Sequence, residues 1–176
     1  SQLFITQSVR IQNFFIILLT MIVVMNGHVL IDTQLFAQGW NAQQLGIIAS
    51  IMFAVSAALG QLTPWVSKWF GQWKGFILTS VAIAITMITI PILGIIIGTV
   101  VIMGRNGLLE IFGNTASAMI NKTTESKYRA TTLSTYSMLV NIPYILAAYF
   151  IGYAMDMWSV HSIVALLGGM LLVIAG

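Results

Sequence analysis

Hydrophobic and polar positions divide the chain into long apolar runs separated by short polar stretches. A helix needs about 20 predominantly apolar residues to cross the hydrocarbon layer of a bilayer. Cutting the sequence at its charges and turn formers gives six such runs, so we predict an all-α membrane protein, a bundle of six transmembrane helices. The predicted helices span residues of about 11–31, 42–65, 75–92, 95–121, 130–154 and 161–176.

The stretch 75–121 contains no charged break long enough to separate two helices, yet it is too long for one. As a single helix its roughly 47 residues would extend about 70 Å, more than twice the hydrocarbon thickness. The stretch therefore has to reverse once. We place the reversal at Ile90-Pro91-Ile92-Leu93-Gly94, because proline and glycine occur together only there.

The charges favour one orientation for these six helices. Six of the seven basic residues fall on one side of the membrane, and the other side holds Asp32 and Asp156 without any Lys or Arg. The basic side of a membrane protein faces the cytoplasm. We therefore predict a multi-pass protein of the plasma (cytoplasmic) membrane, with both ends of the chain in the cytoplasm.

Composition supports a lipid environment and excludes several classes of protein. Hydrophobic residues make up 59% of the chain and charged residues only 6%, whereas soluble domains carry roughly a quarter charged residues. The absence of Cys excludes disulfides and thiolate metal sites. The chain starts at Ser1 without a Met and stops inside an apolar run, so we expect it to be part of a longer polypeptide.

The predicted helix 95–121 carries an unusual polar face. Five polar residues recur there at a spacing of three or four, which places them on one side of a helix: Asn106, Glu110, Asn114, Ser117 and Asn121. Glu110 lies near the middle of the span. An ionised group at that depth costs at least about 2.5–3.5 kcal/mol on insertion scales, so it needs a partner, a wet cavity or a proton.

Two hypotheses account for Glu110 and the nearby Arg105, which points about 140° away around the helix. In the first, the two residues belong to a structural network that fixes this helix to a neighbour. In the second, Glu110 carries a proton or recognises a cation, while Arg105 tunes it or binds an anionic group. The sequence leaves both hypotheses open.

A weaker polar stripe follows the helix 130–154 through Ser134, Ser137, Asn141 and Tyr144, and it predicts either a cavity wall or interhelical hydrogen bonds. Near the outer end of the first helix, Asn26 is a further polar candidate. Together these helices give the candidate substrate and proton pathway: Glu110, Arg105, Asn106, Asn114, Asn141, Tyr144, Ser137 and Asn26.

Two other helices have polar residues with a structural interpretation. In the helix 42–65, Ser56, Gly60 and Thr63 form a face of small residues, which predicts close packing against a neighbouring helix. The polar residues of the helix 75–92 are hydroxyls that can bond to their own backbone. They are Thr79, Ser80, Thr86 and Thr89.

Three short motifs carry a family resemblance. Tyr-Arg-Ala-Thr-Thr-Leu-Ser at 128–134 is similar to the R-A-T-x-L-S entry into the eleventh helix of the major facilitator superfamily, and Gly152 to Asp156 resembles the G-x-x-x-D that closes that helix. The loop 66–74 is similar to the family's cytoplasmic D-R-x-G-R-R-K loop, of which it keeps Gly71 and Lys74 but neither the acidic residue nor the Arg pair.

The resemblance implies that this chain is the C-terminal six-helix half of such a transporter, so its helices would be numbers seven to twelve. Each half in this family is a 3+3 inverted repeat, and the two halves enclose a site near the midplane. The implied partners are the lipid bilayer, the N-terminal six-helix half of the same transporter, a small-molecule substrate and protons. No cofactor and no nucleic acid are expected.

The predicted function is secondary active transport of a small solute by alternating access, coupled to protons, with multidrug or other small-molecule efflux as one form of it. No G-x-x-x-x-G-K-[ST] motif for ATP is present. One alternative is a self-contained six-helix protein that dimerises into a transporter or channel. Another is an intramembrane enzyme using Ser117 and His161, but these two would lie most of a bilayer apart, so we do not expect an enzyme.

Overall fold

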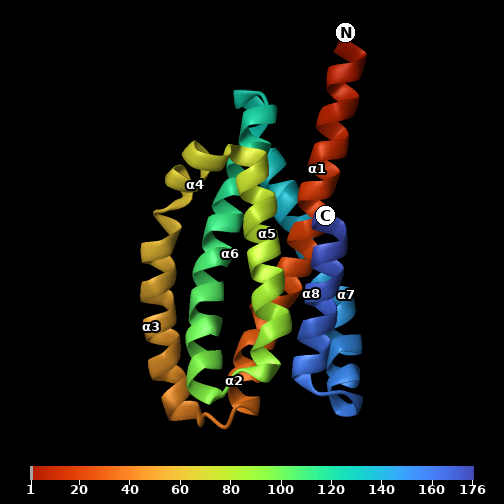
Figure 1. Ribbon diagram of the computed structural model, residues 1–176. Helices are drawn as coiled ribbons and strands as arrows, with labels where there is room; N and C mark the ends of the chain where they lie inside the picture. The colour runs from red at the N-terminus through yellow and green to blue at the C-terminus, as the bar shows by residue number, and fades with distance from the viewer. Residues whose placement is uncertain (1) are drawn as a thin grey trace.

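The computed structural model describes residues 2–176, except for the side chains of residues 2–8, 28 and 29. The described residues form helices and contain no strand (Figure 1). In chain order the elements are α1 (Gln2–Met25), the π-helix η1 (Asn26–Leu30), α2 (Ile31–Ala37), α3 (Ala42–Gly60), α4 (Thr63–Phe70), α5 (Gln72–Thr89), the 3₁₀-helix η2 (Ile90–Ile92), α6 (Ile95–Thr123), the 3₁₀-helix η3 (Ser126–Tyr128), α7 (Arg129–Met157) and α8 (Val160–Ala175).

Four helical segments are long and apolar enough to cross a membrane. They span Ala42–Gly60, Gln72–Ile92, Ile95–Thr123 and Ser126–Met157. Val9–Met25, the part of α1 whose side chains are described, and Val160–Ala175 are also apolar, but each has fewer than 18 residues. Length and composition therefore support a membrane protein, while the number of six spans stays a prediction.

The first helix is longer than the predicted segment 11–31. Helical structure runs without interruption from Gln2 to Ala37, and the π-helical segment Asn26–Leu30 lies inside it. The extension carries the chain through the polar stretch that begins at Asp32, where we expected a loop. The segment is packed inside the bundle, since Gln34 is completely buried and accepts a hydrogen bond from Arg105 of α6.

The connection between the second and third predicted helices is also helical. We expected one helix over 42–65 and a loop over 66–74, but α3 ends at Gly60 and a separate helix α4 follows from Thr63 to Phe70. Pro64 suits the first turn of α4, where a missing N–H costs nothing. Gly71 then ends α4 with a φ of 76°, a conformation that glycine adopts easily.

The remaining boundaries agree with the sequence pattern. The chain reverses at Ile90–Ile92 and Gly94, and α6 begins at Ile95, so the reversal predicted from proline and glycine is confirmed. The predicted hydroxyl bonds in α5 are confirmed as well. Each of the four hydroxyls donates to a backbone carbonyl three or four residues earlier, at 2.6–2.9 Å. They belong to Thr79, Ser80, Thr86 and Thr89.

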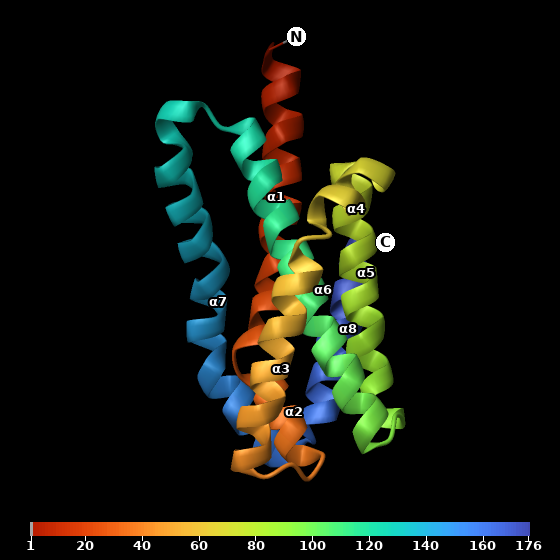
Figure 2. The ribbon, with the colours of Figure 1, turned by 90° about the vertical axis from the view of Figure 1, so that its left-hand side faces the viewer.

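Helix α6 runs through the middle of the bundle, with α3 on one side and α5 on the other (Figures 1 and 2). On its far side α5 packs against α8, and α1 packs against α7. Helix α7 stands apart from α3 and α5 for most of its length (Figure 2) and has a single fully buried residue, Val140.

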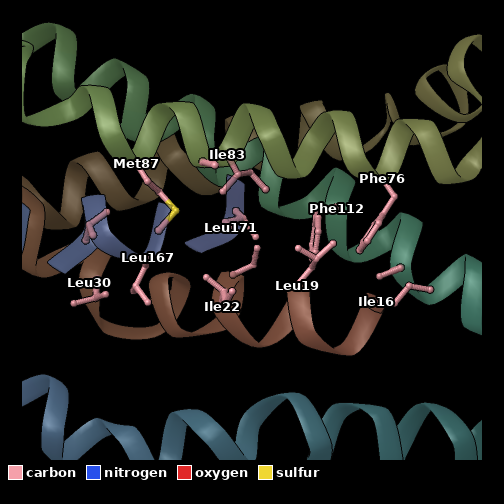
Figure 3. Packing of buried hydrophobic residues seen from close by; sticks show 14 of the residues in the cluster. Ile16, Leu19, Ile22, Leu30, Phe76, Ile83, Met87, Phe112, Leu167 and Leu171 are labelled. Atoms are coloured by element: carbon pink, nitrogen blue, oxygen red, sulfur yellow. The ribbon is translucent and has the colours of Figure 1, made fainter. Parts of the chain in front are cut away.

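The main core lies where α1, α5, α6 and α8 meet. Phe76 of α5 stacks on Phe112 of α6 with ring centroids 4.5 Å apart, and Leu19 of α1 lies beside them (Figure 3). At the other end of this core, Met87 faces α8, where Gly168 allows close approach: a Cβ at Gly168 would lie 2.9 Å from the Met87 Cβ. The core thus fixes α6 at the centre of the molecule.

Candidate functional site

The polar face of α6 packs against the small-residue face of α3. Asn106 donates from Nδ2 to the Ser56 hydroxyl at 2.6 Å, and Asn114 Nδ2 lies 3.5 Å from the Thr63 hydroxyl. Between these two bonds, a Cβ at Gly60 would lie 3.4 Å from the Glu110 Cβ. The predicted close packing of the small-residue face is therefore confirmed, and its partner is the polar stripe itself.

A pocket of about 330 Å³ opens on the other flank of this stripe, between α1 and α6. Its polar side chains are Thr20, Asn106 and Glu110, and the rest of its lining is apolar apart from glycine. Glu110 is exposed, whereas Asn106 is half-buried because of its bond to Ser56. The pocket thus combines a carboxylate, an amide and a hydroxyl within apolar walls.

Thr20 and its partner Tyr136 were not among the sequence-predicted site residues. The Tyr136 hydroxyl donates to Thr20 Oγ1 at 2.9 Å, and Thr20 itself donates to the carbonyl of Ile16 at 2.7 Å. This pair joins α7 to α1 beside the pocket. Tyr136 follows Ser134 and precedes Ser137, so the polar stripe that we assigned to α7 passed over it.

Arg105 lies away from the pocket and does not pair with Glu110. Its side chain is completely buried, and Nη2 donates to Gln34 Oε1 on α2 at 2.5 Å. Asn26, in the π-helical segment, is also completely buried. The structure therefore separates the two charged residues of α6: Glu110 faces the pocket, and Arg105 faces α2.

The residues predicted on α7 do not line the Glu110 pocket. Ser137 is exposed, while Asn141 and Tyr144 are half-buried. Asn141 donates from Nδ2 to the carbonyl of Ser137 at 2.8 Å, within its own helix. Of the predicted pathway residues, the pocket thus brings together Asn106 and Glu110, with Asn114 one turn further along α6.

A larger hollow of about 670 Å³ lies elsewhere, where α5 meets α1 and α8. Its lining is mainly apolar and includes Trp73, Ile77 and Ile174, with Lys74 at its edge. None of the predicted pathway residues contributes to it. The candidate functional site is therefore the smaller pocket, which contains the Glu110 carboxylate of α6.

The pocket's chemistry suits binding of a polar group or a proton. Among the side chains that the structure describes, no group of three or more His, Cys, Asp or Glu could hold a metal ion. Comparison with protein-family models, with curated proteins and with solved structures found no match. The interpretation therefore depends on the residues and their geometry alone.

Proposed function

We propose that this chain is one half of a secondary active transporter of the major facilitator type, which moves a small solute across the membrane with protons. The observation that carries the proposal is the Glu110 carboxylate, which lies in the α1–α6 pocket midway along an apolar helix. A carboxylate at this depth is costly to ionise unless a cavity hydrates it. A cavity that becomes wet and dry in turn would make Glu110 release and take up a proton.

The pairing of helices supports the half-transporter architecture. The six predicted spans correspond to α1, α3, α5, α6, α7 and α8, so exchanging the first three with the last three replaces α1 by α6, α3 by α7 and α5 by α8. The contact between α3 and α6 then corresponds to the contact between α7 and α1, and both contacts are present. The contact of α5 with α6 likewise becomes that of α8 with α1, and α5 with α8 maps onto itself. This exchange is what an inverted 3+3 repeat requires.

The exposed helices support a second half. Large apolar side chains on α3 and α7, such as Phe53, Leu146 and Phe150, are 66–69% exposed. In a transporter of this type, the N-terminal half would cover part of both helices and close the pocket from the open side. A dimer of two such six-helix bundles would cover the same faces, and it is the second candidate assembly. A further six-helix block in the same polypeptide would favour the first.

The test is transport by the full-length protein in proteoliposomes under an imposed pH gradient. A panel of radiolabelled lipophilic cations, sugars, amino acids and carboxylates identifies a transported solute first. Glu110→Gln should then reduce gradient-driven accumulation to the level of liposomes without protein, because the amide cannot carry a proton.

Glu125→Gln is the matched control, because Glu125 is exposed in the connection between α6 and α7 and should not affect transport. Gradient-driven accumulation that survives in Glu110→Gln would exclude Glu110 as the proton carrier. Movement of none of these solutes by the wild-type protein would count against the transporter proposal as a whole.

A further inference from the structure

Arg105 is a completely buried cation with most of its hydrogen-bonding capacity unused. One bond is present, from Nη2 to Gln34 Oε1 at 2.5 Å, whereas Nε and Nη1 have no hydrogen-bond partner among the described residues. A guanidinium has five N–H donors and no acceptor. Leaving buried donors without acceptors costs free energy, and more so when the group is charged.

The unpaired atoms beside Arg105 are donors too. Gln34 uses its oxygen for the bond to Arg105, so its amide nitrogen Nε2 is left buried without a partner. The unused groups of this pair are therefore all N–H donors around one positive charge. Such a pair lacks acceptor atoms, and an acceptor group with negative charge would bind there most strongly.

No carboxylate of the described chain supplies that charge. The chain has four acidic residues, and Glu110 on the same helix faces the α1–α6 pocket. The other three, Asp32, Glu125 and Asp156, are exposed. None of the four forms a hydrogen bond with Arg105 in the part of the chain that the structure describes. A buried charge without a partner is destabilising, so its presence is better explained by a ligand than by stability.

The surroundings of the pair favour a small and singly charged anion. Gln34 lies between Ile31 and Leu35 on α2, and Ile102 lies one turn before Arg105 on α6. These three apolar residues are buried in one cluster. One guanidinium neutralises one carboxylate through two parallel hydrogen bonds, and the apolar neighbours would contact a hydrocarbon body.

We propose that Arg105 and Gln34 bind the carboxylate of a lipophilic organic acid, and that this acid is the solute carried. The proposal rests on the transport function proposed above and names its substrate class. The segment that follows α2 is also bonded to α6, where Thr99 accepts a hydrogen bond from Trp40 Nε1 at 2.8 Å and lies 3.1 Å from Gln38 Oε1. Entry of a solute requires α2 to separate from α6 along this line.

Binding of radiolabelled benzoate to the detergent-purified full-length protein tests the proposal, with benzyl alcohol and benzylammonium as competitors. Benzoate should bind and raise the unfolding temperature, and neither competitor should displace it, because both lack the carboxylate. Arg105→Met should weaken benzoate binding about ten- to a hundred-fold, as expected for loss of charge-assisted hydrogen bonds. Arg105→Lys should weaken it less, because lysine keeps the charge but not the planar fork.

Stability without ligand separates this role from a structural one. If Arg105 binds a ligand, the unfolding temperature of Arg105→Met without ligand should equal or exceed that of the wild type, because the substitution removes an unpaired buried charge. A structural role predicts a lower unfolding temperature in Arg105→Met and benzoate binding that is unchanged in Arg105→Lys. If Arg105→Met does not fold, the affinity of Arg105→Lys decides: a weakened affinity supports the proposal, and an unchanged one overturns it.

Two separate measurements distinguish this proposal from the proton-carrier role: benzoate binding without a pH gradient tests Arg105, and gradient-driven accumulation tests Glu110. Glu125→Gln should bind benzoate with wild-type affinity, because Glu125 is exposed in the connection between α6 and α7. Absence of benzoate binding in the wild type, or binding that inorganic phosphate displaces equally well, would overturn the assignment of a lipophilic carboxylate and leave the proton-carrier test unaffected.

Discussion

The Tyr136 hydroxyl of α7 donates a hydrogen bond to Thr20 Oγ1 of α1 at 2.9 Å, and this bond helps to hold α7 against α1. Thr20 serves it as an acceptor because its own hydroxyl proton is given to the carbonyl of Ile16. Helix α7 has little other buried surface, with Val140 as its single fully buried residue. One bond therefore has more influence on the position of α7 than it would have in a well-packed helix.

We predict that Tyr136→Phe lowers the unfolding temperature by a small amount. Interhelical hydrogen bonds in membranes contribute about 0.6 kcal/mol on average and at most about 2 kcal/mol. The measurement is thermal unfolding in detergent, with Tyr149→Phe as control, because Tyr149 is on the same helix and 78% exposed. Equal unfolding temperatures for the two variants would show that the bond does not hold α7.

The polar residues of α6 show which features can be predicted from neighbouring residues and which contacts cannot. The sequence places Asn106, Glu110 and Asn114 on one face of a helix, and the structure has them there. The sequence does not identify the partner of Arg105, because Gln34 is 71 residues away and lies in a segment that we expected to be a loop.

At the scale of elements, α3 and α6 approach so closely that side chains of ordinary size would collide. A Cβ placed on Gly107 would lie 2.2 Å from Leu59 Cδ1 and 2.8 Å from Leu59 Cβ. The second distance involves an atom that cannot move without the backbone. Gly107 therefore sets the distance between the two helices and, through it, the bond between Asn106 and Ser56.

We predict that Gly107→Ala destabilises the protein by about 1–3 kcal/mol, the usual cost of forcing extra volume into a packed contact. Gly104→Ala is the matched control in the same helix, because nothing lies within 4 Å of a Cβ at that position. Alanine is favoured over glycine in helices by up to about 1 kcal/mol, so the control should be neutral or stabilising. Similar unfolding curves for the two variants would contradict the inference that Gly107 sets the distance between α3 and α6.

The segment from Asn26 to Ala37 is the element that the sequence pattern describes least well. Polar residues from Asp32 onward predict a break, whereas the chain continues as η1 and α2. A π-helical turn is commonly found at functional sites. Here it precedes Gln34, and its extra residue rotates α2 relative to α1, so the direction in which Gln34 points depends on it.

For the whole molecule, the two ends of the bundle differ in charge. The connection between α4 and α5 and that between α6 and α7 lie at the same end (Figure 1). Most of the basic residues lie in these connections or in the adjoining helix ends: Lys68, Lys74, Lys122, Lys127 and Arg129. Asp32 belongs to α2 and Asp156 to the last turn of α7, and both elements lie at the opposite end (Figure 1). The structure thus separates the charges along the bundle axis in the way that the positive-inside rule requires.

We predict that a cysteine at Ser126 reacts only with reagents supplied from the cytoplasmic side, and a cysteine at Ala42 only with reagents from outside. Both positions are exposed, and the chain has no Cys of its own to interfere. Labelling of intact cells and of inverted vesicles with a membrane-impermeant maleimide measures this. Labelling of both positions from one side would overturn the six-span topology.

The sequence by itself determined the features that depend on neighbours along the chain. Apolar length, the proline and glycine at the reversal, and the spacing of polar residues on α6 are all local, because helix geometry and the bilayer convert them directly into structure. The small-residue face of α3 is also a local feature, since it predicts close packing against a neighbouring helix whichever helix that is.

Tertiary structure alone decided which of these faces meet. It placed Ser56 against Asn106, turned Glu110 toward α1 and Arg105 toward α2, and gave Thr20 its partner on α7. These pairings join residues 50 to 116 positions apart. They depend on the packing of whole helices, in which van der Waals contact and interhelical hydrogen bonds decide the partners, so no pattern along the chain could have specified them.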